Sequence, residues 1–264
     1  MAEKKQITEY IFEIKTYKDV FYQLVRQQLV LRYRRTIFGY IWTLLNPILM
    51  MTVTAVVFAS LFKVDLKTFA IFLFAGMIPW NCFNGTVTQS AVSFINNEGL
   101  IKKIYLPRLL FPLSVATGVL IDSLLSFIAL FIIMLIIGAP FSLALLFIPL
   151  AYLLLFFFSF GIALVFSITT VFFRDLQYVI GIAMQALFFL TPILYKSEAL
   201  AGKVAVLINY NPVGVYIELF RAPLYTASLP DLSVVINAML LAIVSMLIGM
   251  MVFIRQEKKI VFRL

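Results

Sequence analysis

The sequence has no histidine, one cysteine and only 12 acidic residues among its 264. Without histidine, and with Cys82 as its one thiol, the chain lacks the usual ligand sets for a zinc site, a cysteine metal cluster or an internal disulfide. An intramembrane hydrolase or glycosyltransferase would need paired carboxylates, histidine or a metal converging on one pocket. The sequence shows no such group of residues, so we expect a protein that is not an enzyme.

Charged residues are also scarce, whereas apolar residues are in excess. Only 12% of the chain is charged and 63% is hydrophobic, and its mean hydropathy is +1.06. A soluble globule of this size needs more polar surface than that, so the apolar excess must face lipid. Six runs nearly free of charge are near or above the ~20 residues that cross a bilayer as a helix. They cover residues 37–62, 68–95, 109–137, 141–173, 177–195 and 232–254. The sequence predicts an all-α integral membrane protein with six transmembrane helices.

The basic residues indicate which side of the membrane each loop occupies. Of the 21 Lys and Arg, 16 fall in the N-terminal arm, the loop between spans two and three, the turn between spans four and five, and the tail. The other five are Lys63, Lys67, Lys196, Lys203 and Arg221. The positive-inside rule then places both termini in the cytoplasm. The net charge of +9 is explained by topology and anionic lipid headgroups, so we expect no nucleic-acid partner.

The first 35 residues differ from the rest and form a separate segment, 1–35, before a six-span domain, 36–264. Apolar residues recur in it at helical spacing, with Lys and Glu between them. They are Ile7, Tyr10, Ile11, Ile14, Tyr17, Phe21, Leu24 and Val25. This pattern predicts an amphipathic helix at the cytoplasmic interface, either as a plain anchor or as a docking surface for a partner. Because no cleavable signal precedes the first span, that span must direct insertion.

Several spans carry polar but uncharged side chains. Thr36, Tyr40 and Thr43 fall on one face of the first span, and Gln177, Gln185, Phe188 and Tyr195 fall roughly on one face of the fifth. Aromatic faces pack against the C–H faces of sugars, and amides and hydroxyls bond their hydroxyl groups. We interpret these seven residues as channel-lining, with helix–helix packing as the alternative for small polar groups at this spacing.

Three motifs together resemble the membrane subunit of type-2 ABC exporters of polysaccharide, the family that exports lipid-linked O-antigen, capsule or teichoic-acid chains. The first runs from Arg32 to Trp42 and continues as Leu45-Asn46-Pro47, and the second runs from Asn97 to Arg108. The third is Phe173-Arg174-Asp175, followed by Pro192-Ile193-Leu194-Tyr195 and Asn211-Pro212. They stand in the family's order and extend over nearly the whole chain. The resemblance implies a multi-pass protein of the bacterial inner membrane that exports a lipid-linked polysaccharide.

The resemblance also implies partners. The chain has no Gly-x-x-x-x-Gly-Lys-Ser/Thr loop, so it holds no nucleotide by that motif and no cofactor of its own is expected. Two copies of this subunit and two separate ATPase subunits, which bind the ATP and Mg²⁺, are the implied assembly. Force would enter through a short helix capped by Asn96 or Asn97 and stopped by Pro107. Its residues are Asn97, Glu98, Gly99, Leu100, Ile101, Lys102, Lys103, Ile104 and Tyr105, with Leu100, Ile101 and Ile104 as its apolar edge. An ordinary topological loop is the alternative.

The longest external segment, 196–231, contains two apolar stretches, 204–208 and 215–220, between turn signals at Asn211-Pro212 and Pro230. Two short, partly re-entrant helices fit this pattern, and they would act as an external gate before the last span.

Two other functions remain open at this point. An ABC exporter of a drug or lipid shares the expected architecture, and an ion-coupled secondary carrier belongs to another class. Asp122 is the one carboxylate deep in any predicted span. A carrier usually needs more coupling-ion ligands and internal repeats of broken helices, so we interpret Asp122 as structural, held by a serine such as Ser123 or Ser126 or by a partner helix.

Overall fold

The computed structural model describes residues 12–13, 15–31, 41–139, 141–195, 202, 208, 210–260 and 262–264. Within these ranges all regular structure is helical, which confirms the all-α part of the predicted fold class. The elements in chain order are α2 (Lys18–Leu31), α3 (Trp42–Phe62), α4 (Leu66–Ala91), α5 (Ser93–Asn96), α6 (Glu98–Lys103), α7 (Leu110–Ile137), η2 (Leu143–Phe147), α8 (Ile148–Phe172), α9 (Leu176–Leu190), α11 (Pro212–Tyr225) and α12 (Leu232–Ile260).

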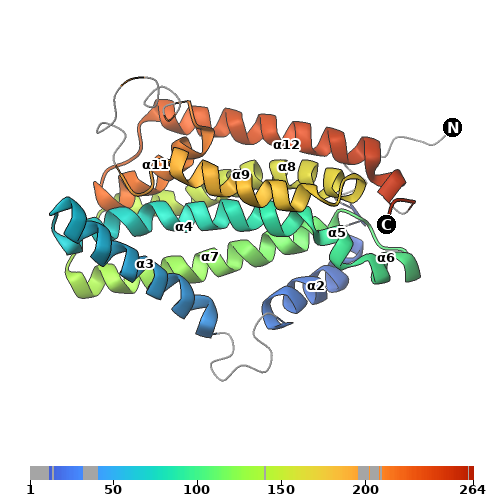
Figure 1. Cartoon of the computed structure of the whole chain (residues 1–264), viewed down its shortest axis with the longest axis horizontal. Coiled ribbons are helices and arrows are strands. Elements are labelled where there is room, and N and C mark those ends of the chain that lie inside the picture. Colours follow the sequence, from blue (N-terminus) through green and yellow to red (C-terminus); the bar gives the residue numbers. More distant parts are fainter. Residues whose placement is uncertain are drawn as a thin grey trace.

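The long helices α4, α7, α8 and α12 lie side by side and form the body of the molecule (Figure 1). One end, which we name the α6 end, carries α5, α6 and residues 262–264, and the opposite, α11 end carries α11 and the turn between α3 and α4. Four helical stretches are long and apolar enough to cross a membrane: Leu66–Ala91, Leu110–Ile137, Leu143–Phe172 and Leu232–Ile260. The shortest has 26 residues, about 39 Å at 1.5 Å per residue, against a hydrocarbon core of about 30 Å. The chain is therefore a multi-pass membrane protein.

The other two predicted spans correspond to α3 and α9, whose apolar described parts, Ile48–Phe62 and Leu176–Leu190, are shorter. Two of the predicted spans extend beyond the ends of the observed helices. The second run ends as α4 at Ala91 and continues as the separate turn α5, and the fifth ends at Leu190, before Pro192. The last run was too short, because α12 continues to Ile260 through three of the basic tail residues.

Local chemistry sets where the elements begin and end. The Asp65 carboxylate caps α4 by accepting hydrogen bonds from the Thr68 backbone N–H (3.0 Å) and hydroxyl (2.9 Å). Gly138 ends α7 with a φ of 76°, a left-handed conformation that glycine adopts without strain. At the start of α11, the Asn211 side chain accepts from the Val213 N–H (2.9 Å) and Pro212 occupies the first turn.

Helices α8 and α12 cross closely at two glycines. A Cβ at Gly249 would collide with the Gly161 carbonyl, and a Cβ at Gly161 would collide with the backbone of Ser245 and Met246. Helices in lipid associate through close van der Waals packing rather than hydrophobic burial, so small residues at a crossing allow the backbones to touch. This pair therefore fixes the last helix against the body.

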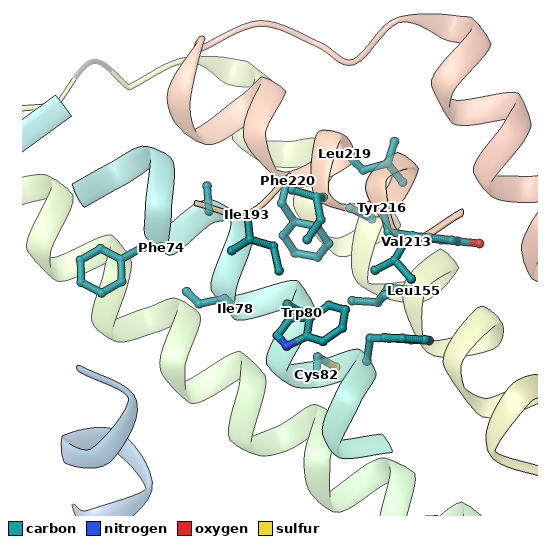
Figure 2. Packing of buried hydrophobic residues seen from close by; sticks show 14 of the residues in the cluster. Phe74, Ile78, Trp80, Cys82, Leu155, Ile193, Val213, Tyr216, Leu219 and Phe220 are labelled. Carbon is teal, nitrogen blue, oxygen red and sulfur yellow. The ribbon is translucent and has the colours of Figure 1, made fainter. Parts of the chain in front are cut away.

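The main core gathers residues of α4, α8, α9 and α11 around a run of aromatic rings (Figure 2). The Phe158 ring stacks between Phe83 (centroids 5.6 Å) and Tyr216 (4.5 Å). The Tyr216 hydroxyl donates to the Ala238 carbonyl (2.7 Å) and ties α11 to α12. The helix predicted over 215–220 is thus present as the longer and mostly buried α11, whereas 204–208 lies outside the described residues apart from Ile208.

Arg221 fixes α11 from within this core. Its side chain is only 7% exposed, it donates to the Ile193 carbonyl (2.8 Å), and its guanidinium lies 3.8 Å from the centre of the Phe72 ring. Gly76 leaves room for it, since a Cβ there would lie 3.1 Å from an Arg221 nitrogen. One cation therefore joins α11, α4 and the segment after α9.

The N-terminal segment is described over 12–13 and 15–31, and α2 packs along α7. Leu24 and Val25 are buried, and Tyr17 and Phe21 pack against a second cluster that includes Phe111. The predicted helical, amphipathic character holds for this part, with the apolar face against α7. The Ser126 hydroxyl donates to the Asp122 backbone carbonyl (2.9 Å), and the Ser123 hydroxyl pairs with that of Tyr152 (3.1 Å). The structural role of Asp122 stays a prediction.

Candidate functional site

The predicted helix between the second and third spans is present as α6 at the α6 end, next to the short α5 (Figure 1). Asn97 stands at the N-cap position as predicted, but its side chain makes no capping bond and donates back to the Ser93 carbonyl (2.8 Å). The helix also ends at Lys103, before Pro107 acts as a stop. Glu98 at the first position and Lys102 and Lys103 in the last turn suit the helix dipole instead.

The apolar edge of α6 divides into an inner and an outer part. Leu100 and Ile101 are partly buried and pack against the second cluster of the chain itself. Ile104 is 49% exposed and Tyr105 is 67% exposed. A shallow cavity of about 280 Å³ adjoins them, lined by Ile101, Lys102, Lys103, Ile104, Tyr105, Leu106 and Arg108. The surface free for a partner is therefore Ile104 and Tyr105 with a basic rim.

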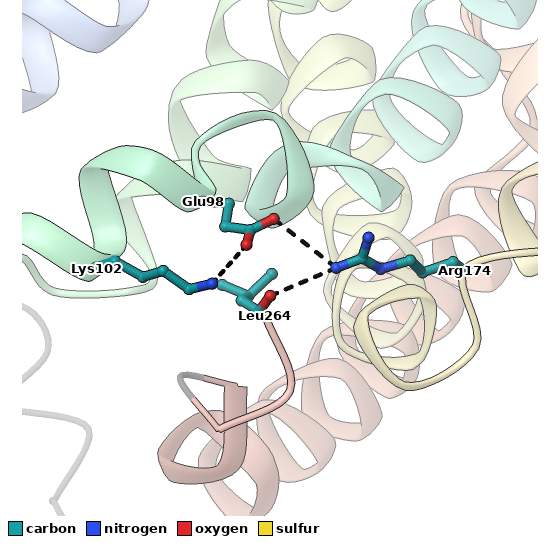
Figure 3. Close-up of polar contacts among 4 residues, drawn as sticks. All are labelled: Glu98, Lys102, Arg174 and Leu264. Carbon is teal, nitrogen blue, oxygen red and sulfur yellow. Dashed lines mark hydrogen bonds and ion pairs between the residues drawn. The ribbon is translucent and has the colours of Figure 1, made fainter.

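The Glu98 carboxylate joins α6 to the turn after α8 at this end (Figure 3). One oxygen of Glu98 lies 2.6 Å from the Lys102 nitrogen, and the other lies 3.8 Å from a guanidinium nitrogen of Arg174. The hydrogen bond from Lys102, together with the charges of both cations, holds the pKa of the Glu98 carboxyl below its usual range. Arg174 also donates to the Leu264 carbonyl (3.5 Å). Three segments distant in sequence thus meet at Arg174.

A groove of about 400 Å³ lies between α4 and α9. Gln185 and Phe188, both predicted to line a channel, are brought together there. The Phe188 ring lies 5.5 Å from Trp80 in an edge-to-face arrangement. The full lining is Trp80, Asn84, Thr88, Gly181, Met184, Gln185, Phe188 and Phe189, none of them charged.

The α4 wall of this groove was missed from the sequence. Trp80, Asn84 and Thr88 recur every four residues and so share one helix face. That spacing was a usable signal, but it lies inside a run that reads as an ordinary apolar span. The Asn84 side-chain oxygen is buried and makes no hydrogen bond among the described residues. A buried amide oxygen without a partner is unfavourable unless a water or ligand donates to it.

The other predicted lining residues lie apart. Gln177 is in the first turn of α9, more than two turns from Gln185. Tyr195 lines a separate cavity of about 430 Å³ at the α11 end with Phe62, Val64, Asp65, Thr68, Phe69, Phe72, Leu194 and Tyr225. Its hydroxyl donates to the Phe189 carbonyl (2.6 Å). Thr36 and Tyr40 lie outside the described residues, as does the side chain of Thr43.

The chemistry of the groove suits a neutral polyhydroxylated ligand. Aromatic rings, two amides and a hydroxyl line it. Aromatic rings pack on the faces of sugar rings, and amides and hydroxyls hydrogen-bond the sugar hydroxyl groups. No group of three or more His, Cys, Asp or Glu that could hold a metal occurs among the described residues.

The chain is similar to known proteins over most of its length. Residues 19–225 match the family described as ABC-2 type transporter. The chain is 32% identical over 204 residues to the O-antigen export system permease protein RfbA of Klebsiella pneumoniae, covering 77% of this chain and 79% of that protein. It is also 27% identical over 225 residues to the O-antigen export system permease protein RfbA of Myxococcus xanthus, covering 83% of this chain and 85% of that protein.

Proposed function

Because this chain belongs to the ABC-2 type transporter family, we propose that it is the transmembrane subunit of an ATP-driven exporter of a lipid-linked polysaccharide of the O-antigen type. The observation that carries the proposal is its 32% identity, over more than three quarters of its length, to a permease of O-antigen export. The neutral groove of aromatic rings and amides between α4 and α9 supports the same substrate class.

We propose six spans, α3 and α9 in addition to the four long helices, with both termini in the cytoplasm of a bacterial inner membrane. The α6 end, which collects basic residues of α6 and α12, would face the cytoplasm. Reporters fused at Ala2 and after Leu264 should both report cytoplasm, and one after Gly202 should report the exterior. An external signal from the C-terminal fusion would refute the six-span topology.

The energy would come from a separate ATPase subunit that binds ATP and Mg²⁺. Residues Asn97 to Tyr105 form the proposed contact, and within them Ile104 and Tyr105 supply the exposed apolar surface. Two copies of this subunit with two ATPase subunits would surround one conduit, and α11 with the segment before it would act as the external gate. Within that conduit the groove residues, with Thr36, Tyr40, Thr43, Gln177 and Tyr195 along its length, would contact the polymer.

Complementation tests the proposal as a whole. A strain with its own O-antigen permease gene deleted would receive this chain together with a candidate ATPase subunit, and surface polysaccharide would be measured with a specific antiserum. We expect surface polymer to return only when both proteins are present and the ATPase can hydrolyse ATP. Lipid-linked polymer that accumulates inside cells containing both intact proteins in the membrane would contradict it.

A further inference from the structure

The groove has one firmly held wall and one loosely held wall. α4 buries sixteen of its residues within the bundle. The facing helix α9 buries only Ile180 and Met184. Elements with few buried contacts move at least cost, so a change in the width of the groove would come mainly from displacement of α9.

The start of α9 is tied rigidly to the turn that precedes it. The Leu176 N–H donates to the Phe173 carbonyl (3.0 Å), the Gln177 N–H to Arg174 (3.4 Å) and the Tyr178 N–H to Asp175 (3.0 Å). Because these bonds continue directly into the helix, a displacement of Arg174 carries the first turn of α9 with it.

Arg174 is held from two sides by segments other than α9. Its guanidinium faces the Glu98 carboxylate of α6 (3.8 Å) and donates to the Leu264 carbonyl (3.5 Å) (Figure 3). Lys102 occupies the other Glu98 oxygen, which fixes the carboxylate in the direction of Arg174. Arg263 lies over the Phe172 ring (5.9 Å) and keeps the segment after α12 against the same turn.

From this arrangement we infer that Glu98 and Arg174 are a pair of positioning residues that transmits movement of α6 to α9 and so sets the width of the α4–α9 groove. The inference rests on the proposed function, because it assigns α6 to contact with the ATPase and the groove to the polymer. Both side chains are partly exposed, at 32% for Glu98 and 56% for Arg174. A subunit seated on α6 would exclude water from the pair and strengthen it in the assembled state.

A double-mutant cycle in the full complex tests the pair. Glu98→Gln, Arg174→Gln and the double variant would be compared for surface polysaccharide and for ATP turnover by the purified complex with its ATPase. Each single variant should reduce export about two- to thirtyfold, the range of coupling along such networks. The ATPase should still co-purify with Arg174→Gln, because Arg174 lies outside the proposed ATPase contact. The double variant should lose no more than a single one, because both changes break one contact. Arg255→Gln, an exposed cation of α12 at the same end, removes the same charge and should export normally.

Charge reversal provides a second readout that a purely structural role would not reproduce. Glu98→Arg with Arg174→Glu should regain export relative to either reversal alone. Losses that multiply in the double variant, together with no recovery in the swapped pair, would overturn the inference. If wild type shows no ATP-dependent export at all, the proposed function fails instead. If wild type exports and all three Gln variants export as well as wild type, only the pair fails.

Discussion

Ile104 offers the sharpest test of where the ATPase binds. Its side chain is 49% exposed, so about half of it remains to be buried by a partner. Full burial of an isoleucine is worth about 1.5–3 kcal/mol, so Ile104→Ala should weaken docking by about 1 kcal/mol, or about fivefold in Kd. Ile104→Asp would add the desolvation of an unpaired carboxylate, about 3 kcal/mol or more, and should weaken docking by more than about a hundredfold.

The measurement is a titration of the purified ATPase against each detergent-solubilised variant, with abundance and thermal unfolding recorded in parallel. Val64→Asp is a matched control, because Val64 is 46% exposed and lies in the turn between α3 and α4 at the opposite end (Figure 1). Leu100→Asp is a poorer probe, since Leu100 packs against the chain's own cluster and its loss would lower stability. Unchanged affinity for Ile104→Asp would refute this contact and favour α2 as the docking surface.

Three further predictions concern the helix crossing, the groove and the buried cation. Gly249→Val should lower the free energy of unfolding by more than about 2 kcal/mol, because its side chain would collide with Gly161. The control Gly181→Ala, whose added methyl group would meet nothing within 4 Å, should change the free energy of unfolding by less than about 1 kcal/mol. Equal melting temperatures for the two variants would contradict the close crossing of α8 and α12. Gln185→Leu should reduce polymer export severalfold, because each lost hydrogen bond costs about 1 kcal/mol. Membrane abundance should not change, because Gln185 is exposed. Reduced abundance would mean that Gln185 packs against neighbouring helices and does not contact the polymer. Arg221→Gln should destabilise the protein by about 1–3 kcal/mol through its lost carbonyl bond and ring contact, and thermal unfolding at the wild-type temperature would show that neither contact matters.

Much of the fold could be predicted because each span is a long continuous apolar run, and the length of such a run indicates a membrane-spanning helix. The boundaries were less predictable where tertiary contacts override the pattern. The last helix continues through Arg255 and Lys259, charged residues that composition assigns to a tail, because Phe253 and Ile260 on the same helix are buried in the second cluster.

Only part of the candidate site could be predicted from the sequence, for a related reason. Gln185 and Phe188 were found because an amide and a ring on one face are conspicuous in a short span. Trp80 and Asn84 were missed, since aromatic and amide residues within a densely buried helix read as packing, and only the position of α9 opposite them makes a groove. The contact between Glu98 and Arg174 joins residues 76 positions apart, which no local pattern reveals.

Reconstitution tests the central claim, ATP-driven export of a polysaccharide through this subunit, most directly. The purified subunit with its ATPase would be placed in liposomes whose outer leaflet contains lipid-linked polysaccharide, and protection of the polymer from an added glycosidase would be followed over time. The account predicts that protection grows with ATP when the nucleotide sites face outward, stops with a non-hydrolysable analogue, and slows with Gln185→Leu. Polymer that stays fully accessible to the glycosidase, while ATP is hydrolysed by an intact complex, would contradict it.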